Sequence, residues 1–156
     1  MSREDLKRRI NRVEEAYEFM LSYAARGLED DRTTSLRSFL EHTHEALDGI
    51  GDAVRACLDE DDAEDAGAKR GVERFVPVLE RDAAASHAAV EMVLAQPAIG
   101  SQLIDNLNAS IHVRALLTDL FLIDEALKLG VGAESPPAGF APDESEPFGP
   151  PDEGSG

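Results

Sequence analysis

The sequence has no tryptophan, only one cysteine and only 5% aromatic residues. Because Cys57 has no second cysteine to pair with, no disulfide can form within the chain, and a reducing compartment suits it. No apolar stretch follows Met1, so we expect no cleaved secretion signal and a cytoplasmic location. The sequence also lacks a glycine-rich phosphate loop, a paired-cysteine zinc site and a nucleophile elbow. We therefore expect a protein without catalysis.

Positive charge is scarce, with 15 Lys and Arg against 32 Asp and Glu and a formal net charge of −17. Six acids lie in the connector 59–65, and six more lie between residues 134 and 153, where there is no Lys or Arg. Nucleic acid and anionic membrane surfaces are therefore disfavoured as partners, because both need a basic face. A basic protein remains compatible as a partner, although acidic tracts also act as simple solubilising segments.

Three segments repeat core-type residues at alternating steps of four and three, which is typical of helices packed side by side. The rows are Leu6, Ile10, Val13, Tyr17, Met20 and Ala24; Leu36, Leu40, Thr43, Leu47, Ile50, Val54 and Cys57; and Val72, Val76, Leu79, Ala83, Ser86, Val90 and Val93. Gly49 and Gly51 weaken the second helix, or let a neighbouring helix approach closely. Pro77 predicts a kink in the third helix.

A fourth helix is expected from Ser101 to about Leu129, and its part from Asn106 onward is apolar around much of its circumference. Short connections between long helices imply antiparallel neighbours. The sequence thus predicts an all-α fold, an antiparallel up-down-up-down four-helix bundle over residues 1–131. The broad apolar surface of the fourth helix fits either a buried central position or a homodimer interface.

From residue 132 the composition changes to Pro, Gly, Ser and acids, which cannot bury enough apolar surface to offset the ordering entropy. Residues 132–156 are therefore predicted to be a disordered acidic tail. Phe140 and Phe148 are its only large apolar residues, and they could anchor in the groove of a partner. The alternative is an inert solubilising tail.

Polar residues beside the predicted core could hold a metal ion. Glu14, His44 and His87 occupy the same flanking position of their helices, and His112 lies on the fourth helix one turn after Asn108. If the helices align, these four residues could approach one another. Imidazole and carboxylate groups in a bundle core are a recurring way to hold iron, manganese or zinc.

Two short spacings resemble known metal-binding families. Glu41 and His44 stand three apart, which resembles the Glu-x-x-His motif of ferritin-like di-iron bundles; that family has the motif twice, and here Ala109 stands three before His112. His87 and Glu91 stand four apart, which resembles one element of hemerythrin-like proteins. Both resemblances imply a non-haem di-metal centre.

Two functions follow from these patterns. The first is a non-catalytic helical adaptor or accessory protein that acts through a helical face, the acidic connector and the Phe-containing tail. In that case the flanking histidines are hydrogen-bonded boundary residues, and no cofactor is needed. The alternative is a metal-binding bundle that uses Glu14, His44, His87 and His112.

Overall fold

The computed structural model describes residues 2–60 and 66–131. Within these two ranges the chain forms helices and no strand, so the predicted all-α class is confirmed there. The helices are α1 (Ser2–Ala24), α2 (Leu36–Leu47), α3 (Ile50–Glu60), α4 (Ala66–Leu94), α5 (Ser101–Ala109) and α6 (Ile111–Leu127). Among the described residues, no helix combines the length and the apolar character needed to cross a membrane.

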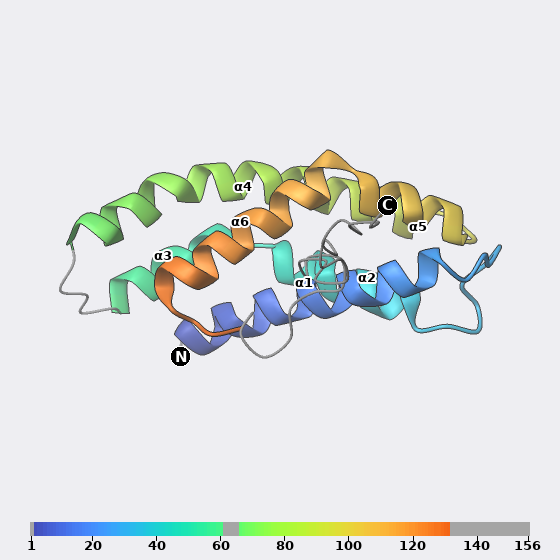
Figure 1. Cartoon of the computed structure of the whole chain (residues 1–156), viewed down its shortest axis with the longest axis horizontal. Coiled ribbons are helices and arrows are strands. Elements are labelled where there is room, and N and C mark those ends of the chain that lie inside the picture. Colours follow the sequence, from blue (N-terminus) through green and yellow to red (C-terminus); the bar gives the residue numbers. More distant parts are fainter. Residues whose placement is uncertain (1, 61–65, 132–156) are drawn as a thin grey trace, which may run out of the picture.

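The helices pack lengthwise in an elongated body (Figure 1). Helix α1 packs against α2, α3 and α5, while α4 packs against α2, α3 and α6. Helices α2 and α3 follow each other along one side of the molecule, and α5 and α6 do so along another (Figure 1). Each helix therefore has neighbours from more than one part of the sequence.

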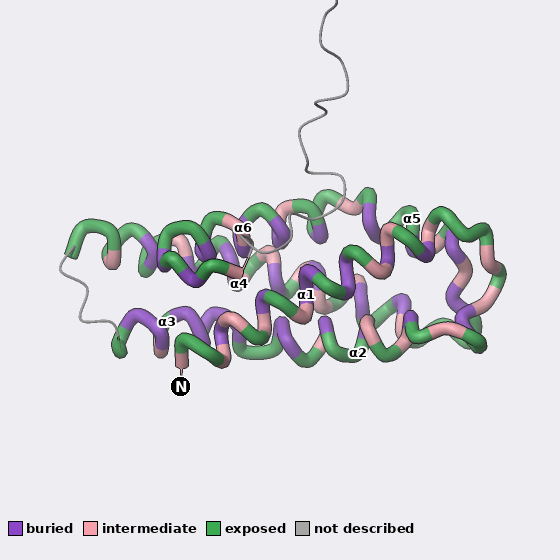
Figure 2. Tube along the Cα trace, turned by 60° about the horizontal axis from the view of Figure 1, so that its bottom comes forward, coloured by how far each residue is buried: buried purple, intermediate pink, exposed green. Residues whose placement is uncertain are grey.

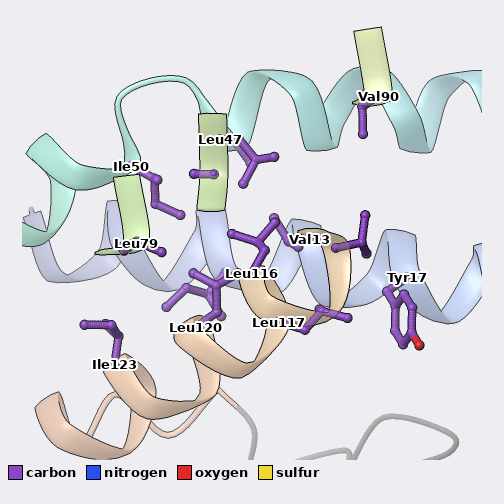
Figure 3. Close-up of a cluster of buried hydrophobic side chains, with 14 of the residues drawn as sticks. Val13, Tyr17, Leu47, Ile50, Leu79, Val90, Leu116, Leu117, Leu120 and Ile123 are labelled. Atoms are coloured by element: carbon purple, nitrogen blue, oxygen red, sulfur yellow. The ribbon is translucent and has the colours of Figure 1, made fainter. Parts of the chain in front are cut away.

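The predicted core rows are the buried rows of the structure. Every member of the three rows is buried except Ala24, which is partly buried and packs against the core. Buried positions recur along the inner sides of the helices (Figure 2). In the middle of the body, Val13 and Tyr17 of α1 face Leu116 and Leu117 of α6, as Figure 3 shows. The heptad pattern thus correctly predicts which side of each helix packs inward.

The helix expected to run from about residue 34 to Cys57 is divided at Asp48 and Gly49. Asp48 has an extended backbone with ψ of 115°, and Gly49 has a φ of +75°, a left-handed conformation that favours glycine. The break separates α2 from α3 and gives two helices where one was predicted. Gly51 does allow a close approach, because a Cβ atom there would collide with the side chain of Glu80 on α4.

The helix expected from Ser101 to Leu129 is also divided, at Ser110. Its backbone turns to ψ of 133°, and its hydroxyl accepts a hydrogen bond from the His112 N–H at 3.2 Å, as a residue that begins a helix does. Helix α4, by contrast, continues through Pro77 from Ala66 to Leu94. The buried row stays in phase on both sides of Pro77, so packing holds this helix together.

One end of the body is held by buried hydrogen bonds between two connections. The Asp31 carboxylate accepts from the Ile99 amide at 3.1 Å and from the Arg37 guanidinium at 3.1 Å. The Tyr23 hydroxyl donates to the Ile99 carbonyl at 2.6 Å, and the Ser101 hydroxyl donates to the Tyr23 carbonyl at 2.7 Å. These bonds satisfy the Ile99 backbone groups, which lie between helices, and a carbonyl in the last turn of α1.

Candidate functional site

Two of the predicted ligands, His44 on α2 and His87 on α4, lie in direct contact. Their ring centroids are 3.7 Å apart and the ring planes differ by 27°, so the imidazoles are stacked. Both residues are half-buried. The Nε2 atom of His44 is buried and has no hydrogen-bond partner among the described residues. The predicted flanking register therefore places these two histidines face to face across the α2–α4 contact.

Glu91 joins the two histidines. It follows His87 by one turn of α4, and a helix places such residues on the same side. One ligand atom from each of the three residues lies within 4.8 Å of the other two, and Glu91 is exposed to solvent. We call these three residues the His–His–Glu cluster. The hemerythrin-like spacing drew attention to His87 and Glu91, but Glu91 was not among the four predicted ligands.

Glu14 does not belong to this group within the described part of the chain. It is buried on α1, and its Oε1 atom has no hydrogen-bond partner among the described residues. Burial, together with the negative charges of Asp124 and Glu18, raises its pKa to about 7. The carboxyl group faces other acids, which places it in a different environment from the His44 and His87 side chains.

His112 is likewise outside the His–His–Glu cluster in the residues that the structure describes. Its side chain is exposed in the first turn of α6, and its carbonyl accepts a hydrogen bond from the Ser86 hydroxyl at 3.0 Å. The break at Ser110 changes the course of the chain just before His112. The prediction assumed a single straight helix and therefore did not account for this change of course. The structure thus brings together two of the four predicted ligands.

A second group of titratable side chains links α4 to α6. Burial, a hydrogen bond with Asp82 and the charge of Asp82 raise the pKa of the Asp119 carboxyl above its ordinary value. Asp119 is buried, and its Oδ2 atom has no hydrogen-bond partner within the described residues. The negative charge of Asp82 disfavours the ionised form of Asp119, because like charges repel. This pair was not anticipated from the sequence.

Exposed apolar side chains also lie on the same two helices. Among the residues described, the exposed large hydrophobic side chains all come from α4 and α6: Val78, Met92, Ile111 and Leu122. Ile111 is 74% exposed and Met92 is 60% exposed. Val78 and Met92 are about four turns apart on α4, and Ile111 and Leu122 about three turns apart on α6, so each pair shares one side of its helix. We call these four residues the α4/α6 face.

A groove of about 240 Å³ opens where α2 gives way to α3. Its lining includes Asp48, Gly49, Glu80 and His87, so it reaches one edge of the His–His–Glu cluster. In this lining, Glu80 accepts a hydrogen bond from the Arg55 guanidinium at 2.6 Å. His87 contributes an imidazole to the same lining. The groove exists because the break at Gly49 interrupts the helical wall.

The predicted partner anchors Phe140 and Phe148 lie outside the described residues, as do residues 61–65 of the acidic connector. Comparisons of the chain with protein-family models, with curated proteins and with solved structures give no match. A function for the chain is therefore inferred from the contacts, burial and charges of residues 2–60 and 66–131.

Proposed function

We propose that the chain is a non-catalytic helical adaptor that acts through protein–protein contacts, with the α4/α6 face as a contact surface. The observation that supports this proposal is the grouping of the exposed large hydrophobic side chains of the described residues on two helices that pack together. Single exposed apolar residues scattered over a surface carry no meaning, but apolar residues gathered on one face favour an interaction site.

We also propose that the six helices of residues 2–60 and 66–131 form a four-membered up-down-up-down bundle, with α2 continuing into α3 and α5 into α6. Contacts in three pairs of helices support antiparallel neighbours. Ser2 at the start of α1 bonds Glu60 at the end of α3, and Arg37 near the start of α2 bonds the Leu94 carbonyl at the end of α4. Ser86 meets the first turn of α6, while Asp82, one turn earlier in α4, meets Asp119 further along α6. In such a bundle, the outer sides of α4 and α6 form one surface.

The partner that we propose for this surface is a second copy of the chain. Most of the net charge of −17 lies in the connector 59–65 and in residues 134–153 rather than on the α4/α6 face. Arginines also lie on these two helices at exposed positions, namely Arg74, Arg81 and Arg114. A pair of identical apolar faces is self-complementary about a two-fold axis, which is the commonest way for soluble proteins to associate.

The first prediction is that replacing Met92 and Ile111 together with Gln abolishes self-association. Gln keeps the charge and the helix propensity close to those of Met, while it removes apolar area that only a partner could cover. Both sites are exposed, so we expect the free energy of unfolding to change by less than about 1 kcal/mol for the pair. His42→Gln, an exposed substitution on α2, is the matched control and leaves association unchanged.

Sedimentation equilibrium over a range of protein and salt concentrations tests this prediction by measuring the molar mass in solution. Because two copies of charge −17 repel each other at long range, added salt screens the repulsion and strengthens an apolar contact. The wild-type chain is expected to form dimers more readily as salt rises, and the double variant to remain a monomer. A wild-type chain that stays monomeric throughout, or a double variant that associates like wild type, rejects the proposed function.

A further inference from the structure

We propose that His44, His87 and Glu91 form a binding site for a single divalent transition-metal ion, held between α2 and α4. The site is separate from the proposed contact surface, because none of its three residues belongs to the α4/α6 face. It also differs from the four-residue arrangement expected from the sequence, because Glu91 takes part and Glu14 and His112 do not.

The donor set decides the class of ion. Two imidazole nitrogens and one carboxylate oxygen are the ligands of His₂Glu zinc sites and of two-histidine, one-carboxylate iron sites. Calcium and magnesium prefer an all-oxygen shell, so two imidazoles argue against them. Glu91 is exposed to solvent, so an ion can enter from that side and keep water in its remaining positions. Zinc is the simplest probe because it binds these ligands without redox chemistry.

The geometry requires side-chain rotation but no movement of the helices. The three ligand atoms lie within 4.8 Å of one another, whereas ligands bound to one zinc ion at about 2.0–2.2 Å stand roughly 3.3 Å apart. Rotation of the exposed Glu91 side chain and a tilt of one imidazole could supply the difference. Imidazole lone pairs lie in the ring plane, so the ion would sit at the edge of the stacked pair and draw the rings out of their stacked arrangement.

The Nε2 atom of His44 provides a second reason to propose a metal site here. It is buried and has no hydrogen-bond partner within the described residues, although a buried polar atom is normally satisfied. A metal ion would use the lone pair of this nitrogen when the proton of the neutral ring lies on Nδ1. The helices already hold His44 against His87, so most of the ordering needed to bring ligands together is complete before an ion binds.

The test is a titration of the full chain, prepared without a polyhistidine tag and freed of metal by a chelator, with Zn²⁺ followed by calorimetry. We expect one ion per chain and a melting temperature that rises with Zn²⁺, because the ion binds only the folded site. His44→Asn, His87→Asn and Glu91→Gln are each expected to weaken zinc binding at least about tenfold, the lower limit for losing even an outer-shell group.

Matched controls lie on the same or neighbouring helices. His42→Asn, Glu41→Gln and His112→Asn remove an exposed imidazole or carboxylate outside the cluster, and each is expected to leave the Zn²⁺ affinity unchanged. Zinc binding is also expected to weaken on acidification, because protons compete for the same nitrogens. Circular dichroism shows whether each variant folds. If a histidine variant fails to fold, Glu91→Gln still tests the site, because Glu91 is exposed and its replacement is not expected to disturb the core.

Two outcomes would overturn the proposal. One is a failure of the wild-type chain to bind Zn²⁺ with defined stoichiometry. The other is zinc binding that Glu91→Gln and the foldable histidine variants leave intact, which would assign the ion to the acidic segments. The same titration of the Met92→Gln, Ile111→Gln double variant separates the two proposals, because its Zn²⁺ affinity is expected to equal that of wild type.

Discussion

Replacing Asp31 with Ala is expected to lower the free energy of unfolding by about 3 kcal/mol, a large fraction of the stability of a domain of this size. The Asp31 side chain is 7% exposed and bonds both the Arg37 guanidinium and the buried Ile99 amide. Without the carboxylate, the Ile99 amide loses its acceptor, and the Arg37 guanidinium keeps only its bonds to the Leu94 and Gln96 carbonyls. The connections at that end of the body therefore lose a common contact. Urea denaturation followed by circular dichroism measures the change.

The neighbouring residue Asp30 gives a matched control. Asp30 pairs with Arg32, whose side chain is 84% exposed, so Asp30→Ala is expected to leave the free energy of unfolding nearly unchanged. Equal losses for Asp30→Ala and Asp31→Ala would show that the buried hydrogen bonds contribute little.

The stabilisation that Asp31 provides also depends on pH. Burial raises the pKa of this carboxyl, but the hydrogen bonds from Arg37 and the Ile99 amide outweigh burial and hold the pKa below its ordinary value of 3.8. The folded state therefore binds a proton less readily than the unfolded state. This stabilisation is fully present above pH 3.8 and is lost as the pH falls through the lowered pKa of the folded state. The stability difference between wild type and Asp31→Ala should shrink in that acidic range.

Replacing Glu14 with Gln is expected to stabilise the chain at pH 8 and to leave its stability nearly unchanged at pH 4. Burial is the largest cause of the rise in the Glu14 pKa from 4.5 to about 7, followed by the charges of Asp124 and Glu18. The folded state therefore holds a proton that the unfolded state releases. Stability falls as the pH rises from 4.5 to about 7, and the loss is complete above that range.

The expected gain for Glu14→Gln at pH 8 is at most about 3.5 kcal/mol, because the Glu14 pKa is raised from 4.5 to about 7 and each pKa unit corresponds to about 1.4 kcal/mol. Gln resembles the protonated acid in shape and carries no charge to desolvate. Glu15→Gln, at the exposed adjacent position, serves as the control and is expected to change stability by less than about 0.5 kcal/mol at either pH. A Glu14→Gln variant with the same gain at pH 4 and pH 8 would contradict ionisation of a buried carboxyl as the cause.

The sequence predicts the buried sides of the helices well and their continuity poorly. Leu6, Leu40 and Leu79 are fully buried because steps of four and three place apolar residues on one side of a helix. The same rows run in phase across Asp48 and Gly49, so periodicity could not locate that break. A left-handed conformation at Gly49 is local backbone information that the row of apolar residues does not contain.

The candidate site follows the same division. His44 and His87 meet because both flank buried rows on helices that pack together, and they are two of the four residues that the shared flanking position predicted to approach one another. Glu14 flanks a buried row in the same way but lies near the charges of Asp124 and Glu18. The sequence could not predict this placement, because residue spacing does not give the rotation of α1 relative to its neighbours. Glu91 could be assigned to the site only from its place one turn after His87 on α4. The contact of Asp82 with Asp119 could be predicted only once α4 and α6 were known to pack together.

The methyl resonance of Met92 is the most direct test of association through the α4/α6 face, because Met92 lies at the proposed contact. The chain has three methionines. Met92 is 60% exposed on the face, whereas Met20 is buried on α1 and serves as an internal control. In carbon-13 methyl spectra recorded over a range of protein concentrations, the account predicts that the Met92 resonance shifts as dimers form while the Met20 resonance stays in place. A Met92 resonance that is constant across that range would contradict it.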